Sequence, residues 1–217
     1  MTLCRLLIRP FARNSRAATS SCVLGLLLLA AGPLVNPSQG SQLLAGPEPQ
    51  AWTAVERGEN ELYAITPERR ALLNTIRYAE GTWKQGAAGY RTLYGGGRFF
   101  SLAKHPEIVV SKRYTSAAAG AYQFLPKTWS EAAAKLNLAS FGPRHQDQAA
   151  LYLVDRRGVL DQVDSRGLTR EVMNVLAKEW ASFPNTNGRS AYGQPVKKAA
   201  ELAAFYERNL LELRQQA

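Results

Sequence analysis

Hydrophobic residues recur at three- and four-residue spacing in five segments between residues 62 and 217, and this pattern predicts five amphipathic helices. Each segment begins at a threonine or a proline, which suit the N-cap or the first turn of a helix. The apolar stripes place Trp129 and Tyr206 in the core. The segments begin at Thr66, Pro126, Pro143, Thr169 and Pro195, and the first, third and fourth end near Gly81, Gly158 and Pro184.

The stretch between the first two predicted helices, residues 82–125, follows a different pattern. It holds six glycines with tyrosines and phenylalanines between them, and Val109 and Val110 form an apolar pair that suits a short strand. An irregular segment of this length inside one domain is usually functional. We therefore expect a mainly α domain over residues 62–217, with a small β or loop segment flanking a cleft.

The first forty residues have the pattern of a secretory signal. Residues 1–21 carry four arginines and no acid, and an apolar run follows over residues 22–35. Small residues at 30–32 or 38–40 offer cleavage sites, and the alternative is an uncleaved N-terminal anchor. Lipidation is excluded because Cys22 stands at the start of the apolar run and not just after it. Residues 41–61 are expected to be a linker or irregular lead-in.

Composition narrows the chemistry. Two histidines and two cysteines, both cysteines within residues 1–40, argue against a metal site or a disulfide scaffold. The net charge is +10, and it falls to +6 without the leader. A basic exported protein suits an anionic partner such as a bacterial envelope, so we expect a periplasmic or extracellular location. Nucleic acid is the competing partner, but the charges are scattered and an export signal removes the protein from the cytoplasm.

Glu80 is the residue whose position most needs a chemical explanation. At about 100° per residue its direction lies between those of Leu73 and Ile76, on the apolar stripe of the first predicted helix. Burial and the negative end of the helix dipole both disfavour a carboxylate there and raise its pKa. A protonated carboxylic acid can protonate a glycosidic oxygen. The alternative is a buried carboxylate paired with Arg77 or Arg91.

A set of short motifs occurs in one order over about residues 70–195. They are Ala79-Glu80-Gly81-Thr82, Gly89-Tyr90-Arg91-Thr92-Leu93-Tyr94-Gly95-Gly96, His105-Pro106, residues 116–125 with Gly120-Ala121-Tyr122-Gln123, Trp129, Phe141-Gly142-Pro143, Gln146-Asp147, Arg157-Gly158, Trp180-Ala181-Ser182-Phe183-Pro184 and Tyr192-Gly193-Gln194. Each motif is weakly specific, but the colinear set resembles the lambda-phage endolysin family of lytic transglycosylases.

This resemblance implies a lysozyme-like fold and cleavage of the MurNAc–GlcNAc β-1,4 bond of peptidoglycan. It also implies that Glu80 is the single catalytic residue, acting first as an acid and then as a base while the MurNAc C6 hydroxyl attacks C1. The product would carry a 1,6-anhydro end. We expect no cofactor and no metal. The expected partners of a monomeric protein are glycan strands, with membrane contact only through an uncleaved leader.

The acids of the sequence bear on the type of reaction. A hydrolase normally needs two carboxylates, and residues 81–106 contain none. This favours transglycosylation, although Asp147, Asp155 or Asp161 could fold back toward Glu80. The family has an acid where this chain has Arg91, which puts substrate preference in doubt but not the reaction class.

Residues for sugar binding follow from the shape of a glycan. Aromatic rings cover the flat faces of sugars, and hydroxyls and amides bond their edges. Gln123 is expected beside the catalytic acid, because its motif resembles the glycine–x–x–glutamine element of lytic transglycosylases. Packing in the core is an equal alternative for each aromatic residue. The candidate faces are Tyr90, Tyr94, Tyr114, Tyr122 and Trp180, and the candidate edge partners are Ser116, Gln123 and Ser182.

Two other functions stay open on the sequence. One keeps the lysozyme-like fold but makes the protein a hydrolase of peptidoglycan or chitin. The other is a non-catalytic glycan-binding or structural envelope protein. The chemistry of the cleaved ends distinguishes a hydrolase from a transglycosylase. Loss of cleavage on substitution of Glu80 distinguishes an enzyme from a protein that only binds glycan.

Overall fold

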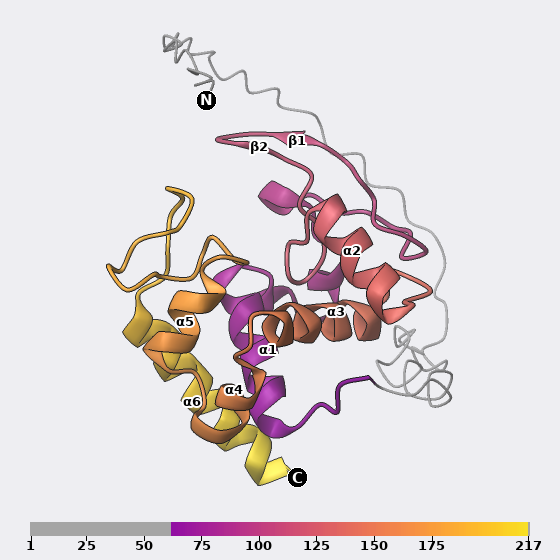
Figure 1. Ribbon diagram of the computed structural model, residues 1–217. Helices are drawn as coiled ribbons and strands as arrows, with labels where there is room; N and C mark the ends of the chain where they lie inside the picture. Colours follow the sequence, from indigo (N-terminus) through magenta and orange to yellow (C-terminus); the bar gives the residue numbers. More distant parts are fainter. Residues whose placement is uncertain (1–61, 217) are drawn as a thin grey trace, which may run out of the picture. The chain divides into compact units, whose positions relative to one another are not determined.

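The computed structural model describes residues 62–216, so the expected leader and linker lie outside the described residues. Within this range the chain is mainly α-helical, as expected, with one hydrophobic cluster shared by its elements (Figure 1). Between α1 and α2 lie two 3-10 segments and one small sheet. The elements are α1 Pro67–Ala79, η2 Trp83–Arg91, η3 Tyr94–Gly96, β1 Val110–Ser111, β2 Thr115–Ser116, α2 Pro126–Leu136, α3 Pro143–Arg156, α4 Leu160–Arg166, α5 Arg170–Leu176 and α6 Ala199–Gln216.

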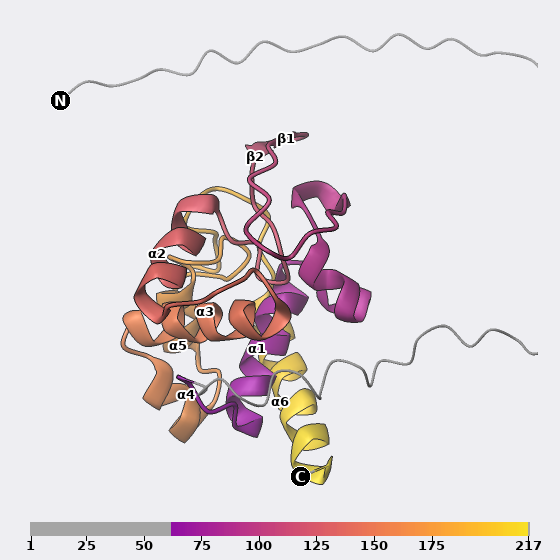
Figure 2. The same cartoon turned by 90° about the vertical axis from the view of Figure 1, so that its right-hand side faces the viewer.

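Helix α1 is the central helix of the domain and contacts α3, α4, α6 and η2 (Figures 1 and 2). It begins as predicted, because the Thr66 hydroxyl caps it by accepting the N–H of Arg69 at 3.3 Å. Residues 71–77 are buried consecutively, so the helix is enclosed on all sides and not only along its apolar stripe. Two of its buried polar side chains are paired: Asn74 donates to the Asn209 side chain of α6 at 2.8 Å, and Thr75 donates to the carbonyl of Ala71 at 2.7 Å.

Two helix boundaries differ from the sequence prediction, and one helix was not predicted. Helix α5 ends at Leu176, well before Pro184, and residues 177–179 continue as hydrogen-bonded turns, with the backbone N–H of Trp180 bonding the carbonyl of Leu176. Helix α6 begins at Ala199 and not at Pro195. Helix α4 was not predicted, since its seven residues contribute only two buried side chains and show little periodicity. In the described residues, none of the helices is both long and apolar enough to span a membrane.

The small sheet is an antiparallel hairpin in the glycine-rich segment, close to the predicted strand. Val110 pairs with Ser116, and Ser111 pairs with Thr115. Both views place β1 and β2 at the outer edge of the described domain, far from α4 and the C-terminal end of α6 (Figures 1 and 2). The hairpin therefore lies beside the helices, and of its four strand residues Val110 packs against their core.

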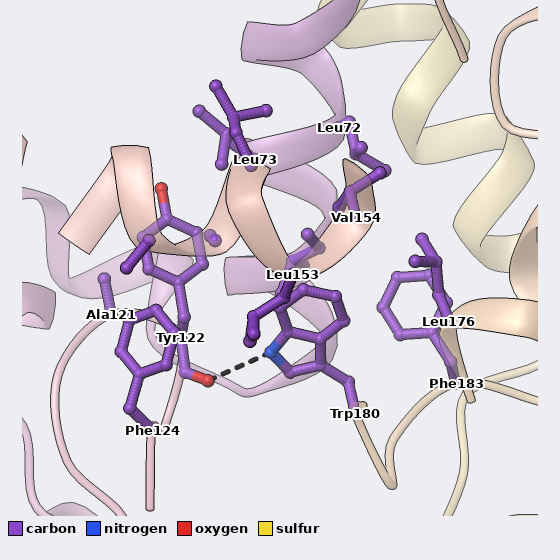
Figure 3. Packing of buried hydrophobic residues seen from close by; sticks show 14 of the residues in the cluster. Leu72, Leu73, Ala121, Tyr122, Phe124, Leu153, Val154, Leu176, Trp180 and Phe183 are labelled. Atoms are coloured by element: carbon purple, nitrogen blue, oxygen red, sulfur yellow. Dashed lines mark hydrogen bonds between the residues drawn. The ribbon is translucent and has the colours of Figure 1, made fainter. Parts of the chain in front are cut away.

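Aromatic and aliphatic side chains from most elements share the core, including Trp129 and Tyr206, as predicted. Trp180 is also buried, and its indole Nε1 donates to the backbone oxygen of Tyr122 at 3.1 Å (Figure 3). This bond ties the segment after α5 to the segment before α2. The two segments are thereby fixed relative to each other beside the end of α1.

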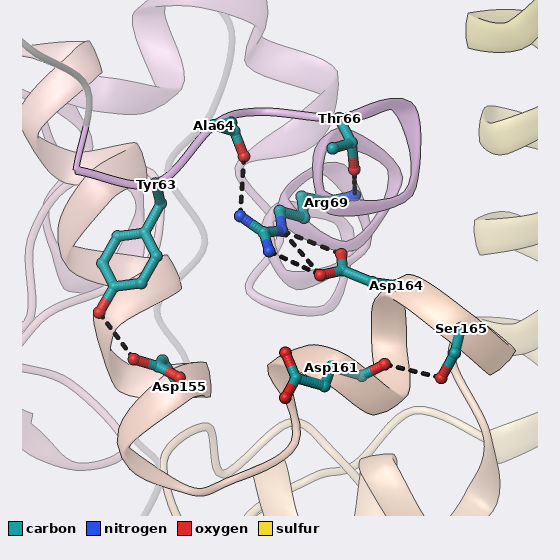
Figure 4. A network of polar contacts seen from close by, with 8 residues as sticks. All are labelled: Tyr63, Ala64, Thr66, Arg69, Asp155, Asp161, Asp164 and Ser165. Carbon is teal, nitrogen blue, oxygen red and sulfur yellow. Dashed lines mark hydrogen bonds and ion pairs between the residues drawn. The ribbon is translucent and has the colours of Figure 1, made fainter.

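Polar contacts hold the start of α1 against the neighbouring helices α3 and α4 (Figure 4). Arg69 forms an ion pair with Asp164 of α4 at 2.6 Å. Tyr63 donates its hydroxyl to Asp155 of α3 at 3.0 Å. These contacts fix the direction in which α1 runs, and so the place where it ends.

Candidate active site

A cavity of about 450 Å³ lies at the C-terminal end of α1 and includes Glu80 in its lining. Its walls come from the glycine-rich segment, the beginning of α2 and the long connection between α5 and α6. The lining residues are Glu80, Tyr94, Tyr114, Thr115, Ser116, Ala118, Gln123, Leu125, Thr128, Lys178, Glu179, Trp180, Ala181, Tyr192 and Gln194.

The end of α1 holds Glu80 in a fixed backbone position. Glu80 is the C-cap, and its N–H still bonds the carbonyl of Ile76 at 2.9 Å. Gly81 follows at φ +76°, the left-handed conformation that glycine adopts without steric cost. The N–H of Gly81 bonds Tyr78 and the N–H of Thr82 bonds Arg77, which together form a Schellman motif. The motif stops the helix and leaves the Glu80 side chain at the cavity.

Burial raises the pKa of Glu80 to about 7, as the sequence pattern led us to expect. The Ser182 hydroxyl opposes this shift, because it donates to Oε1 of Glu80 at 2.6 Å and so stabilises the ionised form. Desolvation is the larger of the two effects. The carboxyl group is therefore divided between its protonated and ionised forms near neutral pH.

The alternative reading of Glu80 as half of a buried ion pair does not fit the geometry. Arg77 stacks on Trp83 and Tyr90, with its guanidinium carbon 5.2 and 4.8 Å from the ring centroids, and it donates to the carbonyl of Gly86. Arg91 donates to the backbone oxygen of Phe100. Within residues 62–216 no ion pair to Glu80 is present.

Gln123 lines the cavity with Glu80, and its side chain has a defined orientation. Its Nε2 donates to the carbonyls of Gly120 at 2.9 Å and Thr92 at 3.2 Å, so the amide oxygen is the end left for other partners. The residue itself lies at φ +50°, an uncommon conformation for a side chain with a Cβ atom. Such strain is typical of functional sites.

Four more of the predicted sugar-binding residues line the same cavity: Tyr94, Tyr114, Ser116 and Trp180. Trp180 is only 4% exposed, so its ring forms a wall more than an open platform. Ser182 contacts the site through Glu80. Tyr192 is 59% exposed and lines the cavity, but it was not among the predicted sugar-binding residues. The signal that could have revealed it is its motif, Tyr192-Gly193-Gln194, since an irregular segment gives no periodicity.

The structure does not bring Tyr90 and Tyr122 to the cavity. Both rings are buried, and both hydroxyls donate to Oδ1 of Asp147, at 2.7 and 2.5 Å. Oδ2 of the same carboxylate accepts from Arg70 at 2.6 Å. The two tyrosines therefore satisfy a buried charge, the core alternative that the sequence had left open. The signal that could have revealed this is an acid on the apolar face of α3, which needs partners.

A second carboxylate, Glu179, also belongs to the cavity lining. Its Oε1 accepts hydrogen bonds from Arg156 Nη2 at 2.7 Å and Arg157 Nε at 2.6 Å. Two guanidinium groups therefore compensate this carboxylate. Asp147 and Asp155 do not line the cavity. Asp147 accepts a hydrogen bond from Arg70, and Asp155 accepts one from Tyr63.

A larger cavity of about 570 Å³ lies between α5, residues 184–188 and the start of α6. Its lining carboxylate, Glu171, accepts hydrogen bonds from its own backbone N–H and from Thr169, and these lower its pKa. An acid held ionised cannot donate a proton near neutral pH. The smaller cavity with Glu80 is therefore the candidate active site. Residues 62–216 contain no cluster of three side chains suited to a metal ion.

Comparisons with known proteins agree with this fold. A family model for endolysins matches residues 70–212. The endolysin of Escherichia phage lambda is 32% identical over 149 residues, covering 66% of this chain and 91% of that protein. The endolysin of Escherichia phage P2 is 34% identical over 91 residues, covering 42% of this chain and 52% of that protein.

Solved structures of the phage lambda lysozyme are also similar. One, a complex with a chitohexasaccharide, is 31% identical with a TM-score of 0.62 and covers 68% of this chain and 97% of that chain. Another is 28% identical with a TM-score of 0.60, at the same coverage. The extent of the family match and the identity to the lambda protein place this chain in the endolysin family.

Proposed function

We propose that this protein is an exported peptidoglycan lytic transglycosylase that cleaves MurNAc–GlcNAc bonds with Glu80 as its single acid and base. The observation that carries the proposal is a carboxyl group with a pKa raised to about 7, in a cavity lined by aromatic and polar side chains. Membership of the endolysin family, and the oligosaccharide in one related structure, support a glycan as substrate.

In the first step Glu80 acts as an acid. Ser182 donates to Oε1, so in the protonated form the acidic proton lies on Oε2. Transfer of this proton to the glycosidic oxygen allows the bond between that oxygen and C1 of MurNAc to break. A donor pKa near the ambient pH suits such a transfer.

In the second step the same side chain acts as a base. The Glu80 carboxylate accepts the proton of the MurNAc C6 hydroxyl as the C6 oxygen bonds to C1, which closes the 1,6-anhydro ring. The Ser182 hydroxyl stabilises the carboxylate between the two steps. Glu80 ends protonated, as it began, because the proton it gave to the glycosidic oxygen is replaced by the one from the C6 hydroxyl, and no water is consumed.

The second candidate is a hydrolase, and Glu179 is the one observation in its favour. A hydrolase would need this second carboxylate to activate water or to attack C1. Its Oε1 is already bonded to Arg156 and Arg157, and these contacts hold the carboxylate against α3, so this oxygen is not free to approach C1 or a water molecule. We therefore favour the mechanism that uses Glu80 alone.

Export is the part of the proposal that rests on residues 1–40 alone. Their arginines and apolar run would direct the domain across a membrane to its substrate, either cleaved or as an anchor. Deletion of residues 1–40 should leave the protein in the cytoplasm, and export of the truncated chain would contradict this assignment.

Digestion of purified sacculi, followed by mass spectrometry, tests the proposed reaction. The proposal predicts fragments that end in 1,6-anhydro-MurNAc. Fragments that end in reducing MurNAc would identify a hydrolase. Equal release of fragments by the wild type and the Glu80→Gln variant would favour a protein that only binds glycan.

A further inference from the structure

The segment that forms one wall of the cavity is strongly basic. Residues 81–130 contain seven lysines and arginines but a single acid, Glu107. Within residues 62–216 none of these seven cations forms an ion pair with a carboxylate. The excess positive charge on this wall is therefore not neutralised by the protein.

Two of these cations lie close to the cavity, one against a lining residue and one against the chain neighbour of a lining residue. The Arg113 guanidinium carbon lies 5.6 Å from the centroid of the Tyr114 ring. The Lys112 ammonium donates to the carbonyl of Gly95, next to Tyr94 in the chain. Tyr94 and Tyr114 are themselves joined, since the Tyr114 N–H donates to the Tyr94 hydroxyl at 3.2 Å.

The connection between α5 and α6 contributes a third cation. Lys178 is exposed and lines the cavity. The Tyr192 hydroxyl fixes its backbone by donating to its carbonyl oxygen at 2.6 Å. Two arginines compensate the lining carboxylate Glu179, and Glu80 is only partly ionised near neutral pH, so together they leave the rim with excess positive charge.

We propose that Lys112, Arg113 and Lys178 form a cationic rim that binds carboxylates carried by the glycan, so that the site selects anionic strands over neutral ones. This inference rests on the proposed function and names the substrate class of the same cavity. Peptidoglycan strands carry peptides with free carboxylates, whereas chitin has no ionised groups. Each exposed contact contributes little alone and is weakened by salt.

Chemically modified substrate tests the rim without changing the protein. Peptide-bearing glycan strands are prepared in two forms, one native and one with its carboxylates amidated. With the full-length protein we expect amidation to raise KM about tenfold, in keeping with three surface contacts of modest strength. We also expect added salt to raise KM for native strands and to leave KM for amidated strands nearly constant.

Three substitutions test the residues themselves. The triple variant Lys112→Gln, Arg113→Gln and Lys178→Gln should raise KM about tenfold on native strands and lose the discrimination between the two substrates. A matched control removes three exposed cations away from the cavity. It combines Lys135→Gln, Arg166→Gln and Arg208→Gln, has the same net charge as the rim variant and should discriminate like the wild type.

The outcomes separate this inference from the proposed function. If the wild type cleaves both substrates with the same KM and salt dependence, the proposal of a cationic rim is wrong, while the proposed cleavage of glycan strands is unaffected. If the wild type cleaves neither, the proposed function fails. Equal effects of the two triple variants would show that net charge, and not the rim, governs binding. Circular dichroism confirms that each variant is folded.

Discussion

The hydroxyl of Ser182 donates to Oε1 of Glu80 at 2.6 Å, although 102 residues separate the two in the chain. Ser182 belongs to the connection between α5 and α6, whereas Glu80 caps the central helix α1. This bond therefore makes the ionisation of the candidate catalytic acid depend on a segment outside the helical core. It also explains why a residue that does not line the cavity belongs to the site.

Substitution of Ser182 should change the pH dependence of cleavage. The hydrogen bond lowers the pKa of Glu80, so Ser182→Ala should raise it further. Because the first step needs the protonated acid, the decline of kcat/KM at high pH should move to higher pH. Ser182→Thr keeps a hydroxyl and should retain the wild-type profile. A shift to lower pH in the alanine variant would contradict the assigned hydrogen bond.

Glu80 should make the stability of the protein depend on pH. Burial raises its pKa from 4.5 to about 7 in the folded state. Below both values the carboxyl is protonated in the folded and unfolded states, so it costs no stability. As pH rises between them the unfolded chain loses its proton first, and stability falls by about 3 kcal/mol in total.

The Glu80→Gln variant should remove this cost. Urea unfolding should find it more stable than the wild type at about pH 8 and equally stable near pH 4. The amide oxygen of the substituted side chain can still accept the Ser182 hydrogen bond, so that contact is kept. A constant difference in unfolding free energy across this pH range would mean that Glu80 is not desolvated in solution.

Asp147 should be far more important for stability than a surface carboxylate. Its replacement by alanine leaves Arg70 and two buried tyrosine hydroxyls without their acceptor, which should cost about 3–5 kcal/mol. The control is Asp164→Ala, which removes the more exposed ion pair to Arg69 and should cost about 1 kcal/mol or less. Equal losses in urea unfolding would contradict the buried network.

Gly120 should be intolerant of a side chain. Its φ is +81°, and an added Cβ would lie 2.3 Å from Oε1 of Gln146. Gly120→Ala should therefore destabilise the fold and displace Gln123, whose amide bonds the Gly120 carbonyl. Gly96→Ala is the control, because Gly96 also has a positive φ but meets no atom within 4 Å. Similar melting temperatures for the two variants would contradict this packing.

The sequence pattern was most informative where one helix had strong local signals. Thr66 and Gly81 marked the ends of α1, and the position of Glu80 on its apolar side predicted the raised pKa. The pattern failed for α4, because a seven-residue helix has too few turns to show periodicity. It also overran α5, whose hydrophobic spacing continues to Trp180 although the regular helix gives way to turns after Leu176.

Side-chain placement in the site was only partly predictable. Tyr94 and Tyr114 line the cavity while Tyr90 and Tyr122 are buried, and all four lie in the same glycine-rich segment. Composition does not distinguish them, because the difference depends on Asp147 from α3, a partner distant in sequence. Tyr192 and Lys178 were missed for the same reason: irregular segments acquire their neighbours only from the tertiary fold.

The fate of water in the reaction tests the central claim most directly. Sacculi are digested in heavy-oxygen water, and the new MurNAc ends are analysed by mass spectrometry. If Glu80 alone transfers the proton and the C6 hydroxyl is the nucleophile, the ends are 1,6-anhydro sugars without heavy oxygen, and Glu80→Gln slows their release about 10²–10⁴-fold. Reducing ends that carry heavy oxygen at C1 would contradict the account.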